Sequence, residues 1–286
     1  MLNQGQRATV LGIVGNSAAG KTTLAQGLAD IIGRERCALI CADDYHRFSR
    51  QERLDAGLSP ADPRNNHLDI LEQHLWTLRT GKPILKPVYD HATGLLSRPE
   101  YVEPKPYVLV EGLLCYSSRG LRDCFDVKLF LEPDERLRER WKLERDVLAR
   151  GYALEQARQL LGRSKRDASN FIQPQRLFAD IVIAFFHEHP EQPEADSELS
   201  VRHILRPTLP HPDLTPLLDP SVSNGLSLAL SRDLGIQAEA WGPFWPGDGD
   251  PGTRGPFLRR RGRVAVIAVS SAEVTAPFMA TGRFDS

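Results

Sequence analysis

The sequence predicts an α/β fold built on a mostly parallel sheet with helices on both faces. Short apolar runs alternate with segments whose apolar residues recur at helical spacing, an order typical of strands buried between two helix layers. The chain has 286 residues, enough for one large α/β domain with a smaller addition. The runs expected to form strands cover residues 8–14, 37–42, 107–110, 126–131 and 180–186.

The stretch after the first run carries the strongest functional signal. It reads Gly15-Asn16-Ser17-Ala18-Ala19-Gly20-Lys21-Thr22, with the P-loop spacing G-x-x-x-x-G-K-T, and a segment with helical periodicity follows from Thr23. In such a loop, backbone N–H groups and the helix N-terminus face phosphates. We therefore expect a P-loop NTPase-type fold with an ATP site at Gly15 to Thr23. Lys21 would contact the β- and γ-phosphates and Thr22 would bind Mg²⁺. A glycine-rich turn without a ligand is the alternative.

The remaining elements follow from periodicity and from the residues that interrupt it. We expect helices at residues 68–79, 133–150 and 153–161, and weaker strands at residues 199–205 and 264–269. Pro133 is suited to open the second of these helices, and Gly151 to end it. Residues 47–67 are polar and are expected to form a loop.

Composition excludes several classes of protein. Lys and Arg number 36 against 37 Asp and Glu, a formal net charge of -1, which argues against a general nucleic-acid or membrane-surface protein. No apolar run is long enough to span a bilayer, and the polar N-terminus leads straight into the first strand. We therefore expect a cytoplasmic protein without a signal peptide. Cys37, Cys41, Cys115 and Cys124 lack zinc-site spacing and are expected to be mostly small buried hydrophobes.

Two carboxylates stand where strands end. Asp43 follows the second strand and Glu111 ends the third, and ligands of parallel sheets bind at those ends. Phosphoryl transfer to a hydroxyl needs a phosphate cradle, Mg²⁺ and a carboxylate that accepts the hydroxyl proton. We expect Asp43 to be that base and Glu111 to bind Mg²⁺ or polarise the acceptor, so that Lys21, Asp43 and Glu111 are the catalytic candidates. An aspartate that caps a turn or helix is the alternative for Asp43.

Five further segments carry a resemblance to a known family. They read Ile-Cys-Ala-Asp-Asp-Tyr-His-Arg (40–47), Asp-Pro-Arg-Asn-Asn (62–66), Lys-Pro-Val-Tyr-Asp-His-Ala-Thr-Gly-Leu-Leu (86–96), Val-Glu-Gly-Leu-Leu (110–114) and Ala-Asp-Ile-Val-Ile (179–183). With the P-loop, and in the family's order, they resemble the phosphoribulokinase family over residues 8 to about 186. The Asn-Lys-x-Asp signature of GTPases and the motif set of protein kinases are absent.

The resemblance implies phosphorylation of the C1 hydroxyl of D-ribulose 5-phosphate, with ATP and Mg²⁺ as cofactors. Uridine kinase is a wider relative, because it shares the P-loop and an acidic segment after the second strand. A uridine or cytidine kinase, or another small-molecule kinase of the superfamily, is therefore the first alternative. An ATP-binding regulator without turnover is the alternative from another class.

The resemblance also implies roles for individual residues. Asp43 resembles the family's general base, and the residues implied in substrate binding are His46, Arg50, Arg53, Arg64, Tyr89 and His91. Arg145 and Arg150 resemble lid arginines that close over the phosphates of ATP, and Lys142 is a further candidate there. A solvated helix face with i,i+4 ion pairs is the alternative for this lid.

The chain departs from the family pattern at three places. Ala19 stands where photosynthetic members place a P-loop cysteine, so a disulfide of that kind with Cys41 is not expected. His67-Leu68-Asp69 replaces Asn-Phe-Asp, and Leu114 stands where a histidine is common. The last two departures lie near the implied acceptor site.

The chain is expected to have three parts. Residues 1–190 form the P-loop kinase domain, residues 191–234 a small irregular C-terminal extension of it, and residues 235–286 a divergent or disordered tail. The expected partner is a small sugar phosphate, with no nucleic acid and no membrane. We also expect a homo-oligomer.

Overall fold

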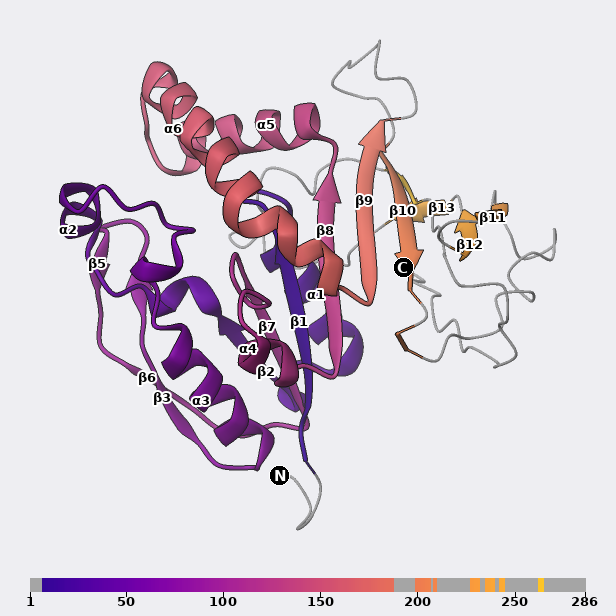
Figure 1. Ribbon diagram of the computed structural model, residues 1–286, viewed down its shortest axis with the longest axis horizontal. Helices are drawn as coiled ribbons and strands as arrows, with labels where there is room; N and C mark the ends of the chain where they lie inside the picture. Colours follow the sequence, from indigo (N-terminus) through magenta and orange to yellow (C-terminus); the bar gives the residue numbers. More distant parts are fainter. Residues whose placement is uncertain are drawn as a thin grey trace. The chain divides into compact units, whose positions relative to one another are not determined.

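The computed structural model describes residues 7–187, 199–206, 208–209, 227–231, 235–239, 242–244 and 262–264 (Figure 1). The chain divides into two compact units. The first contains residues 1–129 and 146–178, and the second contains residues 130–145 and 179–286.

Parallel strands form the centre of the first unit. β7 (Tyr107–Gly112) lies between β1 (Thr9–Gly15) and β2 (Cys37–Cys41) and runs parallel to both. The first residues of β8 (Val127–Pro133) follow on the other side of β1. Ile13 and Cys41 are both in register with Glu111, so the carboxyl ends of these strands meet at one edge. The predicted parallel sheet is confirmed here.

Both faces of this sheet are covered. Leu109 packs on one face against Ala29 and its neighbours in α1 (Lys21–Ile32). Val108 and Val110 point to the opposite face, because successive strand residues alternate, and they are fully buried as well. α3 (Leu68–Arg79) buries Leu71, Leu75 and Leu78. Burial on both faces therefore explains why consecutive residues of β7 are apolar instead of alternating with polar residues.

Shorter elements surround this core. They are η1 (Arg34–Arg36), η2 (Ala42–Tyr45), α2 (Arg50–Asp55), η3 (Pro63–Asn65), β3 (Ile84–Lys86), β4 (Tyr89–Asp90), β5 (Leu95–Leu96), β6 (Glu100–Val102) and α4 (Arg119–Asp123). β3 pairs with β6 and β4 pairs with β5, both antiparallel. The expectation of a loop throughout 47–67 is wrong, because α2 and η3 form within it. A capping box of Ser49 and Glu52 starts α2 despite its polar sequence.

The helices predicted at 133–150 and 153–161 have other lengths in the structure. α6 (Leu154–Asp167) extends past the predicted end at 161 and continues as η5 (Ala168–Ile172) and η6 (Gln173–Phe178). The helix predicted at 133–150 is shorter: α5 spans Glu135–Glu144, and the π-helical turn η4 (Arg145–Ala149) follows it. Pro133 belongs to the end of β8, and Asp134 caps α5 by accepting bonds from Arg136 N and Leu137 N.

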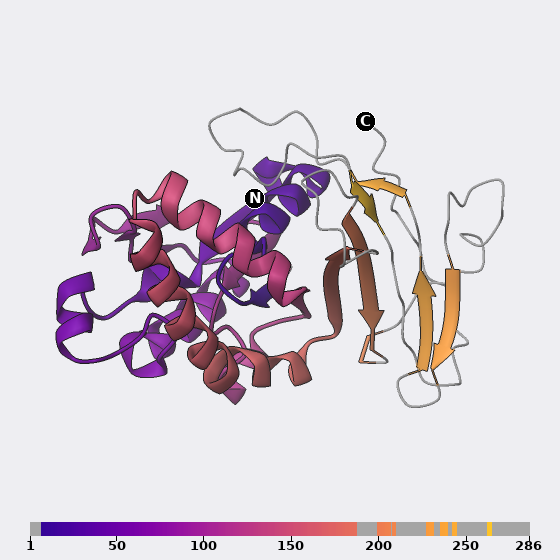
Figure 2. The same ribbon diagram turned by 90° about the horizontal axis from the view of Figure 1, so that it is seen from above.

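In the second unit, β9 (Ile181–His187) follows β8 in the sheet and pairs antiparallel with β10 (Leu199–Leu205). Figure 2 shows β9 and β10 side by side. The further strands are β11 (Ser227–Ser231), β12 (Gly235–Glu239), β13 (Gly242–Phe244) and β14 (Gly262–Val264).

The expected boundaries at 190 and 234 stay predictions, since most of residues 191–286 lies outside the described residues, as do residues 265–269 of the strand expected at 264–269. None of the helices in the described part of the chain is long and apolar enough to cross a membrane. The four cysteines are free thiols, and all except the half-buried Cys41 are buried.

Candidate active site

The loop after β1 has the backbone of a phosphate cradle. Ala18 and Gly20 adopt left-handed conformations, with φ of 66° and 90°, and such conformations turn consecutive N–H groups toward one concave side. Gly20 is needed for this backbone and not for space, because a Cβ there would meet nothing within 4 Å. Ala19 N closes the turn by donating to Asn16 O at 3.1 Å. The loop therefore presents donors that suit an anion.

One buried cation in the cradle, Lys21, suits a phosphate ligand. Lys21 is 7% exposed, and its ammonium donates to Asn16 O at 3.2 Å. An ammonium carries three donors, so Lys21 retains capacity for phosphate oxygens. Among the described residues, the buried Oδ1 of Asn16 lacks a hydrogen-bond partner. An amide oxygen only accepts hydrogen bonds, so this atom suits a water or another donor and not a phosphate oxygen.

Thr22 and Glu111 join the cradle to the end of β7. Thr22 Oγ1 donates to Glu111 Oε1 at 2.8 Å, and Glu111 is 9% exposed. Burial raises the pKa of Glu111, and the Lys21 charge opposes that shift. In the described residues, no three His, Cys, Asp or Glu side chains could hold a metal ion. A hydroxyl and one carboxylate fit Mg²⁺ that arrives with nucleotide phosphates and keeps several waters.

Asp43 lies near this pair. It stands in η2 directly after β2, and the end of β7 approaches η2 so closely that a Cβ on Gly112 would lie 2.6 Å from Ala42 Cβ. Leu113 N donates a long hydrogen bond of 3.4 Å to Asp43 Oδ1. The Asp43 charge also contributes to the raised pKa of Glu111. The two carboxylates therefore lie close to each other at the strand edge that carries the cradle.

The neighbouring Asp44 has a different environment. It forms a buried ion pair with Lys86 Nζ and accepts a bond from Tyr89 N at 3.1 Å. Lys86 is 4% exposed and also contacts Glu100 Oε2 at 3.3 Å. Asp44 therefore anchors the segment that contains β4, and Asp43 is the carboxylate left for chemistry at the cradle.

Three rings form a cluster beside the acidic segment. His46 and Tyr89 lie edge to face with centroids 4.8 Å apart, and Tyr89 and His91 are 5.1 Å apart. His46 Nδ1 lies 2.7 Å from Asn66 Oδ1 and 3.1 Å from Asn65 Nδ2. Burial lowers the pKa of His46 and of His91. Both imidazoles are thus held neutral, as a wall for an uncharged part of a ligand would require.

Residues 10–189 match the profile of the Phosphoribulokinase / Uridine kinase family. The chain belongs to this family. It is 38% identical over 183 residues to a phosphoribulokinase of Synechocystis sp., an alignment that covers 64% of this chain and 55% of that protein. It is 34% identical over 179 residues to a uridine kinase of Chloroflexus aurantiacus, covering 60% of this chain and 85% of that one.

The structural comparison confirms the fold of this family member. A phosphoribulokinase from Rhodobacter spheroides aligns with a TM-score of 0.53 at 22% identity, covering 63% of this chain and 71% of that chain. The chain spans about half the length of the phosphoribulokinases that it matches, 55% in Synechocystis and 48% in Mesembryanthemum crystallinum.

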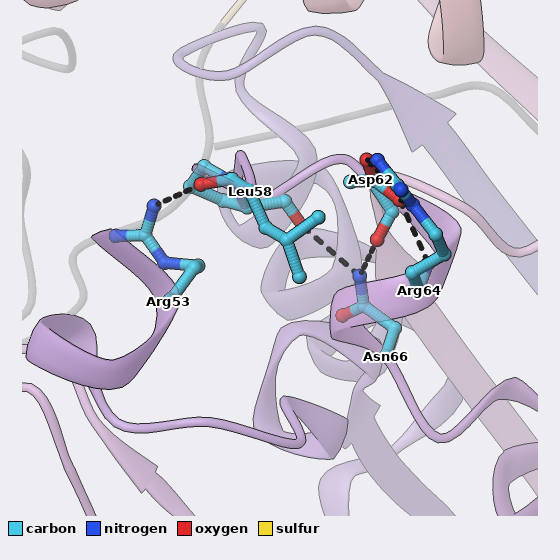
Figure 3. A network of polar contacts seen from close by, with 6 residues as sticks. Arg53, Leu58, Asp62, Arg64 and Asn66 are labelled. Atoms are coloured by element: carbon cyan, nitrogen blue, oxygen red, sulfur yellow. Dashed lines mark hydrogen bonds and ion pairs between the residues drawn. The ribbon is translucent and has the colours of Figure 1, made fainter. Parts of the chain in front are cut away.

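The predicted substrate arginines of this family member differ in their surroundings. Figure 3 draws Arg53 and Arg64 with their contacts. Arg64 forms a two-point ion pair with Asp62, with Nη2–Oδ2 at 2.7 Å and Nε–Oδ1 at 3.0 Å. Arg53 donates to Leu58 O at 3.3 Å, while its buried Nε lacks a partner within the described residues. Arg50 Nη2 donates to His91 O at 2.5 Å.

Arg50 and Arg53 therefore lie at the ring cluster. Arg50 contacts the backbone of His91. Burial is the main cause that lowers the pKa of Arg53, and its interactions with Tyr89 and Arg50 act on that pKa in opposite directions. Arg64 is engaged with Asp62 instead, and its side chain is 77% exposed. Its predicted role in substrate binding stays a prediction.

The two predicted lid arginines fall in different units. Arg150 Nη1 lies 3.4 Å from the buried Asp146 Oδ1, and the Arg150 charge contributes to the lowered pKa of His91. Arg150 is thus near the ring cluster. Arg145 and Lys142 belong to the second unit, and their roles stay predictions.

Some residues of the site were not found by sequence reasoning. Lys86 and Asp44 form the buried pair, and Asn65 and Asn66 hold His46. The available signal was weak: Lys86 interrupts the apolar run from Ile84 to Val88. A cation among apolar residues indicates a buried partner, although it does not say which carboxylate is involved.

The buried histidines predict a fall in stability on acidification. The unfolded chain takes up protons at the ordinary histidine pKa of about 6.5, whereas the folded protein keeps His46 neutral to lower pH. The contribution of the neutral histidine to the free energy of unfolding is therefore fully present above that pKa, and it is lost as the pH falls below it. Urea unfolding at several pH values should show this slope, and it should be shallower in His46→Gln. The same slope in both proteins would contradict the prediction.

Proposed function

We propose that this protein transfers the γ-phosphate of ATP to the C1 hydroxyl of D-ribulose 5-phosphate and produces ribulose 1,5-bisphosphate. The observation that carries the proposal is the meeting of Thr22, Glu111 and Asp43 at the phosphate cradle. The relatives named phosphoribulokinase support the choice of acceptor, and 38% identity to the Synechocystis protein exceeds 34% to the uridine kinase.

The chain's own groups suit each part of the reaction. The cradle and Lys21 bind the β- and γ-phosphates, and Arg150 closes over them. Asp43 accepts the proton of the acceptor hydroxyl while the hydroxyl oxygen forms a bond to the γ-phosphorus of ATP. The bond between the γ-phosphorus and the bridging oxygen to the β-phosphate breaks, and ADP leaves with that oxygen. Thr22 and Glu111 would hold Mg²⁺, which would supply positive charge to the phosphate oxygens.

The substrate side suits a phosphorylated sugar. His46, Tyr89 and His91 form its wall, and Arg50, Arg53 and Arg64 supply cations for the 5-phosphate. An arginine binds phosphate through two parallel hydrogen bonds, and Arg53 has a buried Nε without a partner in the described part of the chain. A neutral nucleoside needs no such cations, which favours the sugar phosphate over uridine.

Measurement of ADP release tests the acceptor directly. Ribulose 5-phosphate is expected to stimulate ADP release from Mg-ATP, while uridine and cytidine are not. Stimulation by uridine alone would assign the protein to the nucleoside kinases of its family. Binding of Mg-ATP without ADP release with any acceptor would instead indicate a regulator that lacks turnover.

Arg50→Ala is expected to raise the KM for the sugar phosphate about 10-fold or more, since hydrogen bonds to a charged group each contribute about 1.5–3 kcal/mol. The KM for ATP should stay nearly unchanged. Arg119→Ala is the matched control, because Arg119 is 88% exposed and pairs only locally with Asp123 in the described structure. A selective rise in the KM for ATP would move Arg50 to the nucleotide side.

We also propose a cytoplasmic location and a homo-oligomeric state. Both carry over the expectations from the sequence, and light scattering on the purified protein tests the second. A mass equal to one chain of 32.0 kDa would contradict it.

A further inference from the structure

Gln175 is a buried side chain that no part of the proposed reaction uses. It lies in η6, is 2% exposed, and bonds three backbone groups with its amide. Nε2 donates to Leu113 O and to Phe171 O, both at 2.7 Å, and Oε1 accepts from Tyr116 N at 2.7 Å. Two carbonyls and one N–H allow a single orientation of the amide, because a carbonyl only accepts and an N–H only donates.

Leu113 O and Tyr116 N, which Gln175 binds, belong to the turn directly after Glu111 and Gly112, whereas Phe171 O lies in η5. Ser117 closes this turn by donating its N and Oγ to Leu114 O at 3.1 and 2.7 Å. Leu113 then has two partners on opposite sides of its backbone. Its N–H donates to Asp43 Oδ1 at 3.4 Å, and its carbonyl accepts from Gln175 Nε2 at 2.7 Å.

We propose that Gln175 is a positioning residue for Asp43. By holding the turn at Leu113 and Tyr116, it keeps the Leu113 N–H directed at the Asp43 carboxylate and so orients the base toward the acceptor hydroxyl. The inference rests on the proposed function, because it needs Asp43 to act as the base. The Leu113–Asp43 bond is long, so a small rotation of the turn is enough to break it.

Gln175→Glu tests the inference with nearly unchanged volume. A carboxylate places oxygen where Nε2 now meets two carbonyl oxygens, so the turn loses its anchor. A displacement of about 1 Å in a catalytic group can cost 10²-fold, so we expect kcat to fall about 10- to 100-fold. Both KM values should change less than about threefold, since ground-state binding is untouched. Gln175→Met, measured in the same way, replaces the variant if the glutamate does not fold.

Tyr116→Phe is the matched control in the same turn. It removes the hydroxyl bond to Leu129 O at 3.1 Å and leaves the Tyr116 N–H on Gln175. We expect its kcat to stay within about twofold of the wild type, because the backbone anchor remains. A loss of kcat in Tyr116→Phe as large as that in Gln175→Glu would show general sensitivity of the turn and would overturn the inference.

Combination with Asp43→Asn separates positioning from structure. If Gln175 acts through Asp43, Gln175→Glu should lower the residual kcat of Asp43→Asn less than about twofold. An equal fold-loss in both backgrounds, or an effect on KM alone, would overturn the inference while the proposed function stands. A wild-type protein without ADP release would sink the proposed function and the inference together.

Discussion

Asp43→Asn is expected to lower kcat by about 10²- to 10⁴-fold, the usual contribution of a positioned general base. The asparagine keeps an oxygen that can accept from Leu113 N, so the turn after Glu111 retains its contact. What is lost is the ability to take the acceptor's proton. Affinity for ATP should stay near that of the wild type, because the cradle lies in residues that the substitution does not touch.

Steady-state kinetics with ribulose 5-phosphate and an independent titration of ATP affinity check this expectation. Asp44→Asn is the matched control, since it changes the adjacent carboxylate in the same way. It should reduce stability through Lys86 while kcat per folded molecule changes much less. Near-normal turnover in Asp43→Asn would refute the base assignment, and equal losses in both variants would show that the acidic segment acts as a whole.

The sequence could predict where Asp43 and Asp44 lie in the fold, but it could not predict which of the two faces the cradle. The P-loop could be predicted because its chemistry is local: Gly15 to Thr22 supply the turn, the donors and the cation within eight positions. Strands β1 and β7 could be predicted because burial on both faces leaves continuous apolar runs. β2 is also a continuous apolar run, although its Leu39 is 42% exposed. The carboxyl ends of parallel strands meet at one edge, so Asp43 and Glu111 could be placed together.

The orientation of Asp43 relative to Asp44 could not be predicted in this way. It depends on the tight turn η2 and on Lys86, a residue more than 40 positions away. The Lys86 ammonium forms an ion pair with the carboxylate of Asp44. Likewise, the anchor of Leu113 comes from Gln175, which lies in a stretch of mixed polar and apolar residues without a clear period. Contacts over such separations depend on the assembled fold and leave no periodic pattern.

Short elements were missed for a related reason. α2 has a polar sequence, and six residues are too few for a helical period to appear. It forms because the Ser49 and Glu52 cap satisfies its first N–H groups and because Arg50 N donates to Gly94 O at 2.7 Å. The same contact brings Arg50 to the ring cluster, so this short helix carries functional residues that its pattern did not reveal.

Lys86→Met is expected to destabilise the folded chain by about 3–5 kcal/mol, the usual cost of breaking a buried ion pair on one side. Lys86 and Asp44 have side chains only 5% and 13% exposed. Without the ammonium, Asp44 stays buried as an uncompensated charge, held in place by its bond from Tyr89 N. Urea unfolding at neutral pH measures the loss.

Two controls isolate the buried charge as the cause. Glu100→Gln removes the other carboxylate near Lys86. The Glu100 side chain is 60% exposed, so this substitution should lower the free energy of unfolding by less than about 1 kcal/mol. Lys86→Met combined with Asp44→Asn should recover part of the loss, because the asparagine still accepts from Tyr89 N and leaves no charge buried. Losses that simply add in the double variant would contradict the assignment.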